Sequence, residues 1–199
     1  MDEKFPNLRE IVVQKCSIQK ISAENFKNLK KLHKLNLRDN EIAVLGANLF
    51  DDLTSLIDLD LGYNKLREID GNCLGSLRNL RGASLAGMNL KQLPPQLFRN
   101  NKKLVTIGMD DNLIEEIPQN FFAGLTDLEN LFLYRNKIHT VTSNTFKDLE
   151  NLKELSLDYN NLRYFPARVL QNNKKLEKVW FDQNQIERIS LKQKLSSMQ

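Results

Sequence analysis

The chain has 199 residues, of which 41% are hydrophobic, and it carries a formal net charge of +4. This length suits a single domain, and we expect residues 1–199 to form one. No apolar run reaches the roughly 18 residues of a membrane span, and residues 1–6 lack the apolar core of a signal peptide. The two cysteines, Cys16 and Cys73, fall at different places in the repeat described next, which argues against a mutual disulfide.

Leucine recurs with a period of 24 residues along the whole chain. It occupies positions 8, 32, 56, 80, 104, 128, 152 and 176, and we take each as the first residue of one repeating unit. A fixed period of this size indicates stacked supersecondary units, none of which can bury its apolar face alone.

Each unit follows the pattern L-x-x-L-x-L-x-x-N-x-[LI]-x-x-[LIVF], then a polar stretch and F-x-x-L. In the second unit Leu35 and Leu37 are two residues apart, which predicts a short strand with both leucines on one face. Asn40 follows where the chain turns inward, and stacked asparagines are expected to form a buried ladder of hydrogen bonds. A spine of stacked phenylalanines is also expected, at positions 26, 50, 98, 122 and 146.

In chain order, the units depart from this pattern at a few positions. Cys16 takes the inward ladder position in the first unit, where a thiol can still make a weak hydrogen bond. Met88 takes it in the fourth unit and cannot donate one, so we predict a local break there. Asn101 and Asn173 replace the late leucine of the fourth and seventh units. The pattern fades in the eighth unit, so residues 190–199 are expected to be a weak C-terminal cap or a truncation.

These motifs resemble the leucine-rich repeat in its 24-residue form, over residues 8 to about 189. The resemblance implies an α/β solenoid shaped like a horseshoe. A parallel sheet of about eight short strands would line its concave side, and a mostly irregular or 3-10 chain its convex side. The repeats with phenylalanine are similar to the extracellular class, including arthropod Toll-type ectodomains and secreted immune proteins. An extracellular or secreted location is therefore implied, with a cytoplasmic one as the alternative because sequons and cysteine caps are lacking.

The residues between the leucines of each predicted strand should point onto the concave surface. There the fourth unit carries small residues, including Gly82, Ser84 and Gly87, whereas the later units carry aromatic and acidic ones. Exposed aromatic side chains among carboxylates are typical of a protein-binding surface. We therefore predict a partner-binding surface made of Phe132, Tyr134, Tyr159, Trp180, Asp110, Asp158 and Asp182. The alternatives are cross-strand packing for the aromatic residues and eased curvature for the small ones.

This surface favours protein recognition as the function. The partner would be basic, and the role receptor-like or immune. A self-associating scaffold is one alternative. The other is a binder of polyanions or pathogen surfaces, because lysine pairs recur at the same place in several units: 30–31, 102–103 and 174–175. Aromatic residues are not interleaved with the lysines, so the sequence gives no sign of nucleic acid binding. We expect no cofactor, metal site or catalysis, since His33 and His139 lie four units apart without a nucleophile beside them.

Overall fold

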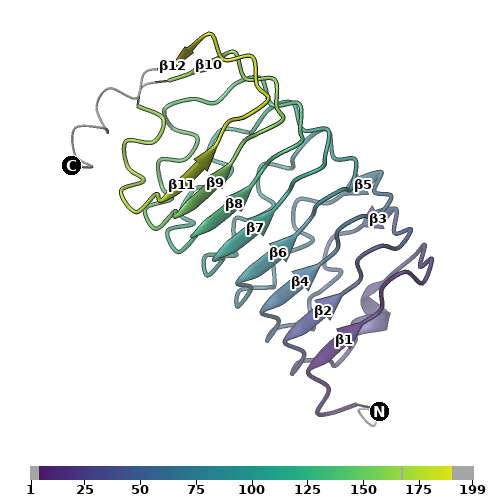
Figure 1. The fold of residues 1–199 in the computed structure, drawn as a ribbon. Coiled ribbons are helices and arrows are strands. Elements are labelled where there is room, and N and C mark those ends of the chain that lie inside the picture. Colours follow the sequence, from purple (N-terminus) through teal and green to yellow (C-terminus); the bar gives the residue numbers. More distant parts are fainter. Residues whose placement is uncertain (1–4, 167, 190–199) are drawn as a thin grey trace.

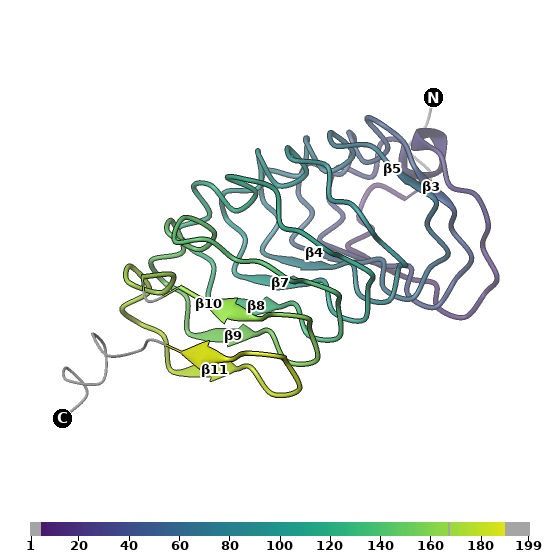
Figure 2. The ribbon, with the colours of Figure 1, turned by 90° about the horizontal axis from the view of Figure 1, so that it is seen from above.

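A computed structural model describes residues 5–166 and 168–189, and it shows a curved solenoid in which each unit forms one coil (Figures 1 and 2). Eight short strands lie side by side as one parallel sheet in the order β1-β2-β4-β6-β7-β8-β9-β11. Their bounds are Glu10–Val12, Lys34–Asn36, Asp58–Asp60, Gly82–Ser84, Thr106–Gly108, Asn130–Phe132, Glu154–Ser156 and Lys178–Trp180. The predicted solenoid with a parallel sheet of eight strands is thereby confirmed.

The register of the sheet follows the period of the sequence. Each strand residue pairs with the residue 24 positions later, as Leu35 does with Leu59 and Leu131 with Leu155. These leucines are almost completely buried and form a continuous core behind the sheet. Burial of one face of every strand fixes the register, because a shift by one residue would turn the leucines out to solvent.

The return arms on the other side of the coils contain little regular structure, as expected. Two short pairs of parallel strands occur there: β3 (Val44–Leu45) with β5 (Glu68–Ile69), and β10 (Tyr164–Phe165) with β12 (Arg188–Ile189). A 3-10 turn, η1 (Ala23–Phe26), is the one helical element in the described part of the chain. Among residues 5–166 and 168–189 no helix is long and apolar enough to cross a membrane.

Each strand of the sheet is followed closely by a residue in the left-handed region. These residues occupy one column, at positions 15, 39, 63, 87, 111, 135, 159 and 183, and Gly87 is the sole glycine among them. A left-handed residue turns the chain inward, so that the next side chain enters the core. L-residues other than glycine adopt this conformation at a cost of roughly 1 kcal/mol each, so the packing of neighbouring coils must offset that cost.

The predicted asparagine ladder is present at that next position. Asn136 is typical: its Nδ2 donates to the carbonyls of Met109 (3.0 Å) and Leu133 (3.1 Å), and its Oδ1 accepts from the amide of Ile114 (3.0 Å). The same pattern recurs at Asn40, Asn64, Asn112, Asn160 and Asn184. Each amide therefore joins its own coil to the preceding one.

The break predicted at Met88 is also present. Its side chain is completely buried but bonds no carbonyl of the third unit. A backbone bond that joins other neighbouring coils at this turn, such as Lys65 N–H to Ile42 C=O (3.1 Å), has no counterpart between the described third and fourth units. The next residue, Asn89, is left-handed as well. Ser17, which follows Cys16 in the first unit, adopts the same conformation. A second left-handed residue thus accompanies each missing ladder asparagine.

The inward position predicted for Cys16 is wrong. Cys16 is exposed, and its thiol donates to the carbonyl of Gln14 (3.0 Å) rather than entering the core. The reason is that, in the described part of the chain, no coil packs before the first unit. Cys73 is buried in the return arm, and burial raises the pKa of its thiol to about 12.

The phenylalanine spine forms in two segments. Phe26 and Phe50 lie 5.5 Å apart, and Phe122 and Phe146 lie 6.2 Å apart. Phe98 joins the later segment through Phe121, which lies 5.5 Å from it and 5.0 Å from Phe122, and Leu74 stands between the two segments. Asn101 is fully buried and its Nδ2 donates to the carbonyls of Leu74 and Leu77 in the third unit, so it makes a polar contact where the repeat pattern has leucine. The expected cap at 190–199 lies outside the described residues.

Candidate partner-binding surface

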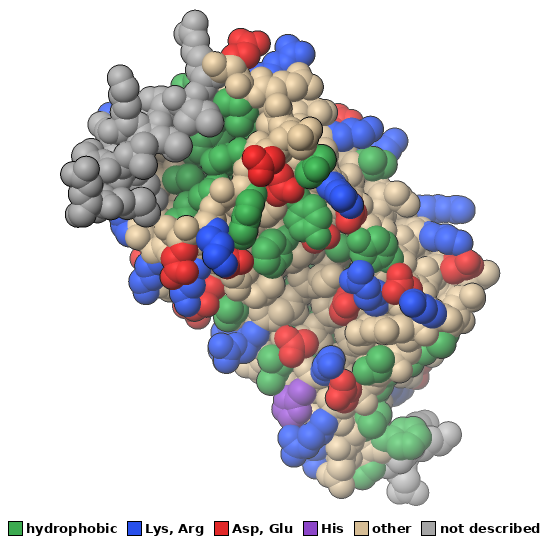
Figure 3. Space-filling view, viewed as in Figure 1, with side chains coloured by type: hydrophobic (Ala, Val, Ile, Leu, Met, Phe, Trp, Pro, Cys, Tyr) green, Lys and Arg blue, Asp and Glu red, His purple; other side chains and the backbone are tan. Residues whose placement is uncertain are grey.

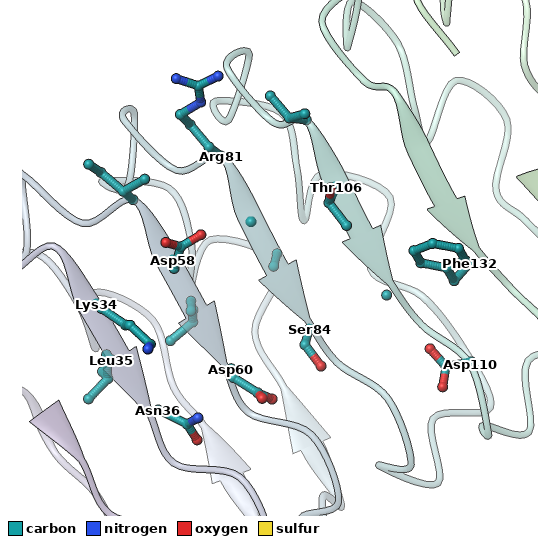
Figure 4. Close-up of a pocket in the computed structure, with 16 residues that line it drawn as sticks. Lys34, Leu35, Asn36, Asp58, Asp60, Arg81, Ser84, Thr106, Asp110 and Phe132 are labelled. Atoms are coloured by element: carbon teal, nitrogen blue, oxygen red, sulfur yellow. The ribbon is translucent and has the colours of Figure 1, made fainter. Parts of the chain in front are cut away.

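The concave face is hollowed over its middle strands. The hollow has a volume of 710 Å³ and extends from β2 to β8, centred on β6 (Figure 4). Asp58 and Asp60 stand on one side, Asp110 and Phe132 on the other, and Gly82 and Ser84 form part of the floor. Figure 3 shows apolar side chains on this face with acidic and basic ones between them.

Neighbouring side chains fill the space beside Gly82 and Gly87 of the fourth unit. A Cβ at Gly82 would lie 2.6 Å from Oδ1 of Asp58, so the missing side chain lets this carboxylate lean over β6. A Cβ at Gly87 would lie 2.6 Å from the ring of Tyr63. Gly108 differs, because a Cβ there would meet its nearest atom at an ordinary 3.5 Å. The lining of the hollow therefore accepts an added Cβ at Gly108 without a clash.

Asp110 and Tyr134, both predicted site residues, lie together at the C-terminal side of the hollow. Asp110 is 8% exposed and lies beside the Tyr134 hydroxyl. Burial raises the pKa of Asp110, whereas the Tyr134 hydroxyl opposes that rise. Burial and the Asp110 carboxylate raise the pKa of Tyr134 to about 12. Asp110 is thus mostly buried beside Tyr134, and not the displayed carboxylate that the sequence predicts.

The other aromatic site residues differ in exposure. Phe132 and Trp180 flank Ser156 in register on β8, β9 and β11, and Ser156 is 5% exposed between them. Phe132, Tyr134 and Trp180 are half-buried, so these three are less exposed than the sequence predicts. Small neighbours such as Ser156 leave room beside the rings. Tyr159 is exposed, as predicted.

The two remaining acids lie beyond Tyr134 on the same face. The Ser156 hydroxyl donates to Asp158, which is half-buried, whereas Asp182 is exposed. The described residues contain no group of three or more side chains suited to hold a metal ion.

Sequence reasoning missed a connected row of side chains at the strand exits. Tyr63 donates its hydroxyl to Oδ2 of Asp111 at 2.8 Å, two coils away. The Arg38 guanidinium lies 4.4 Å from the Tyr63 ring centre. Arg135 lies 3.6 Å from Asp111 and 5.5 Å from the ring of Tyr159. We call these five residues the exit row. It links the hollow to Tyr159, and the pairing of Tyr63 with a glycine 24 residues later is the signal that could have revealed it.

The lysine pairs that suggested a polyanion binder lie apart from this surface. Lys31, Lys103 and Lys175 each donate to the side chain of the asparagine 24 residues earlier, at 2.7 to 3.1 Å. They recur with the coils as separate basic points, in keeping with their even spacing in the sequence.

Three solved structures share this fold. A leucine-rich repeat protein of Leptospira interrogans is 26% identical, with a TM-score of 0.82 over 91% of this chain and 44% of its own. An internalin (inlF) from Listeria monocytogenes is 24% identical, with a TM-score of 0.76 over 92% of this chain and 50% of its own. TLR13, in a complex with ssRNA13, is 24% identical, with a TM-score of 0.71 over 92% of this chain and 31% of its own. The chain thus spans half or less of each.

A comparison with curated proteins found no match. The family model described as "Leucine rich repeat" matches residues 6–56, 30–85, 84–138 and 128–186. These segments together cover nearly every coil. The chain therefore belongs to the leucine-rich repeat family, whose extended concave surface generally serves as a module for protein interaction and typically not as an enzyme.

Proposed function

We propose that the chain recognises another protein through its concave face, and that one basic side chain of the partner enters the hollow over β6. The observation that carries this proposal is the arrangement around β6. Carboxylates and one aromatic ring border a space whose floor has small side chains. Carboxylates attract lysine or arginine, and an aromatic face packs against a guanidinium or an alkyl stem.

Among the carboxylates that line the hollow, Asp58 is the one that is exposed and makes no ion pair with a described residue. Asp60 lies 3.8 Å from Arg38, and its Oδ1 accepts the amide of Gly62. Lys34, at the rim, is paired with Glu10 at 2.8 Å. Asp58 makes no ion pair with any described residue, and its carboxylate leans over Gly82. An incoming cation would therefore find its first partner at Asp58.

The rest of the contact would extend toward the C-terminal strands. Tyr159 is the exposed aromatic side chain of the predicted set, and Asp182 is its exposed carboxylate. Half-buried Phe132, Tyr134 and Trp180 offer ring edges held by their neighbours, which lowers the entropy lost when they contact a partner. Asp158 lies among them. This surface suits a protein partner with a basic, extended contact region.

We place this recognition outside the cell, in a receptor-like or innate-immune role, because the 24-residue repeat with phenylalanine resembles that class. Exposed Cys16 offers a test. A membrane-impermeant maleimide applied to intact source cells should label the protein at Cys16, and a Cys16→Ser variant should stay unlabelled. Labelling that requires cell lysis would place the protein in the cytoplasm.

The binding proposal is tested by filling the hollow. Peptides are selected from a displayed random library on the unmodified protein, and their affinities are measured by calorimetry. Gly108→Phe adds a ring to the lining of the hollow at a position where a Cβ makes only ordinary contacts, and it should reduce affinity by about 100-fold or more. Gly46→Phe is the matched control, since a Cβ at Gly46 meets nothing within 4 Å and Gly46 lies on the return arm.

The selected peptides should be rich in lysine or arginine, and Asp58→Asn should weaken them. Equal binding by the Gly108→Phe variant and the unmodified protein would contradict the placement. Two alternatives leave different signs. A self-associating scaffold would show mass that rises with concentration in light scattering. A polyanion binder would lose affinity steeply with salt and would be insensitive to Gly108→Phe.

A further inference from the structure

A second hollow lies between the return arms of the first and second units, far from the concave sheet. Its volume is 700 Å³, and its lining includes Ile21, Val44, Gly46 and Leu49. Val44 is 46% exposed although it belongs to a strand, β3. The floor is apolar, and the hollow runs along one edge of that strand.

That edge of β3 has unpaired backbone groups. β3 pairs with β5 through its other edge, where Glu68 N–H bonds Ala43 C=O and Asp70 N–H bonds Leu45 C=O. Successive residues of a strand direct their N–H and C=O groups to opposite sides, so those of Val44 face the hollow. Neither group of Val44, nor the N–H of Gly46, bonds any described residue. Such an edge is a template for another extended chain.

The same arrangement recurs at the other end of the solenoid. β10 pairs with β12 through one edge, and a hollow of 540 Å³ lies between its other edge and the sixth unit. Return arms therefore pair in some neighbouring coils and separate in others. The hollow beside β3 differs from the hollow beside β10 in its charge, and this charge indicates which kind of segment would bind there.

The rim of the hollow beside β3 is basic. Lys65 is paired with Glu41 at 2.7 Å, which leaves the pair neutral. Lys20 and Arg67 have no carboxylate partner among the described residues, so the rim has a net positive charge. We propose that an extended, acidic segment of a partner protein adds to β3 as a further strand, with apolar side chains against Val44 and acidic ones toward Lys20 and Arg67. Main-chain bonds would supply affinity and the charges specificity.

The test uses a short, capped peptide of alternating glutamate and valine, titrated into the ¹⁵N-labelled protein. The amide resonances of Val44 and Gly46 should shift, and a lysine–valine peptide should bind about tenfold more weakly, since the reversed charges amount to about 1.4 kcal/mol. Val44→Pro removes the N–H and should abolish the shifts. Val44→Ala keeps the N–H and should retain most of the binding.

Lys20→Glu combined with Arg67→Glu should reverse the preference between the two peptides. This variant keeps the proposal testable if Val44→Pro disturbs the fold, which the dispersion of its spectrum reports. Equal binding of both peptides, or shifts confined to the concave amides of Gly82 and Ser84, would overturn the proposal. Concentration-dependent shifts of Val44 without peptide would assign the edge to a second copy and also overturn it. Gly108→Phe should leave this binding unchanged, so its outcome is separate from that of the concave hollow.

Discussion

The fourth and sixth units have the same length and the same repeat frame, yet they are held to their neighbours differently. Asn136 joins the sixth unit to the fifth through the carbonyl of Met109 and the amide of Ile114. Met88, at the same place in the fourth unit, fills the space with an apolar chain and makes no such bond to the third unit. The sixth unit displays Phe132 and Tyr134 on the concave face, whereas the fourth has glycine, serine and alanine there.

Side chains of the third and fifth units hold the fourth unit instead. The Tyr63 ring lies over Gly87 and reaches Asp111, so the third and fifth units are joined directly across the fourth. A unit that its neighbours bridge in this way can have small residues on its concave face and still be held in the stack. The difference shows that the hollow and the gap in the ladder lie in one coil, which is bridged by its neighbours.

Exchanging the two ladder residues should give the largest effect. Asn136→Met leaves two carbonyls and an amide without partners in the core, and should lower the free energy of unfolding by about 3 kcal/mol. Met88→Asn should change it by less than about 1 kcal/mol, because new hydrogen bonds offset lost apolar burial. Urea unfolding of both variants measures this. Equal losses would mean that the ladder is uniform in energy after all.

Gly87→Ala should remove the bridge. A Cβ there would collide with the Tyr63 ring, and the residue would be held at a φ of +62°. The strained backbone and the lost hydrogen bond together predict a loss of about 2 kcal/mol. Gly108→Ala, in the next unit on the same face, is the control and should be nearly neutral. If both variants lose the same stability, the ring does not hold the fourth unit.

Asp110→Asn should raise the unfolding stability rather than lower it. Burial raises the pKa of Asp110, so its ionised form destabilises the folded state, and this cost is felt as pH rises through its titration. The amide keeps an acceptor for Tyr134 and should raise unfolding stability at neutral pH by up to about 1 kcal/mol. Stability should then depend less on pH in the acid range. Lower stability of the variant would show that the charge is needed structurally.

Tyr134 gives the effect that is smallest at neutral pH. Its pKa is about 12 in the folded protein against 10.0 ordinarily, so the folded state keeps a proton that the unfolded state releases. The stability from this group is complete below pH 10 and is lost as pH rises toward 12. Phenolate absorbance and unfolding curves follow this loss. Tyr134→Phe should lessen the alkaline dependence, and an unchanged profile would assign it to other groups.

The sheet, the ladder and its gap at Met88 could be predicted from the sequence because each depends on residues that repeat with one period. The burial of Phe132 and Trp180 could not, since it depends on the size of Ser156 between them. The reach of Tyr63 to Asp111 depends on a glycine midway, a relation over two periods that a pattern for one unit does not contain. Cys16 was misplaced because its environment depends on a neighbouring coil, and the motif describes each unit alone.

The ion pairs between neighbouring strands bear on the order in which the coils stack. Leucines in every unit are so alike that apolar packing would tolerate a coil docked on the wrong neighbour, within one molecule or between two. Lys178 meets Glu154 at 2.6 Å, and a slip by one unit would bring it beside Asn130 instead. The Tyr63 ring fits beside Gly87 but would meet the side chain of Asp111 after such a slip. The irregular polar residues therefore oppose misassembly that the regular core permits.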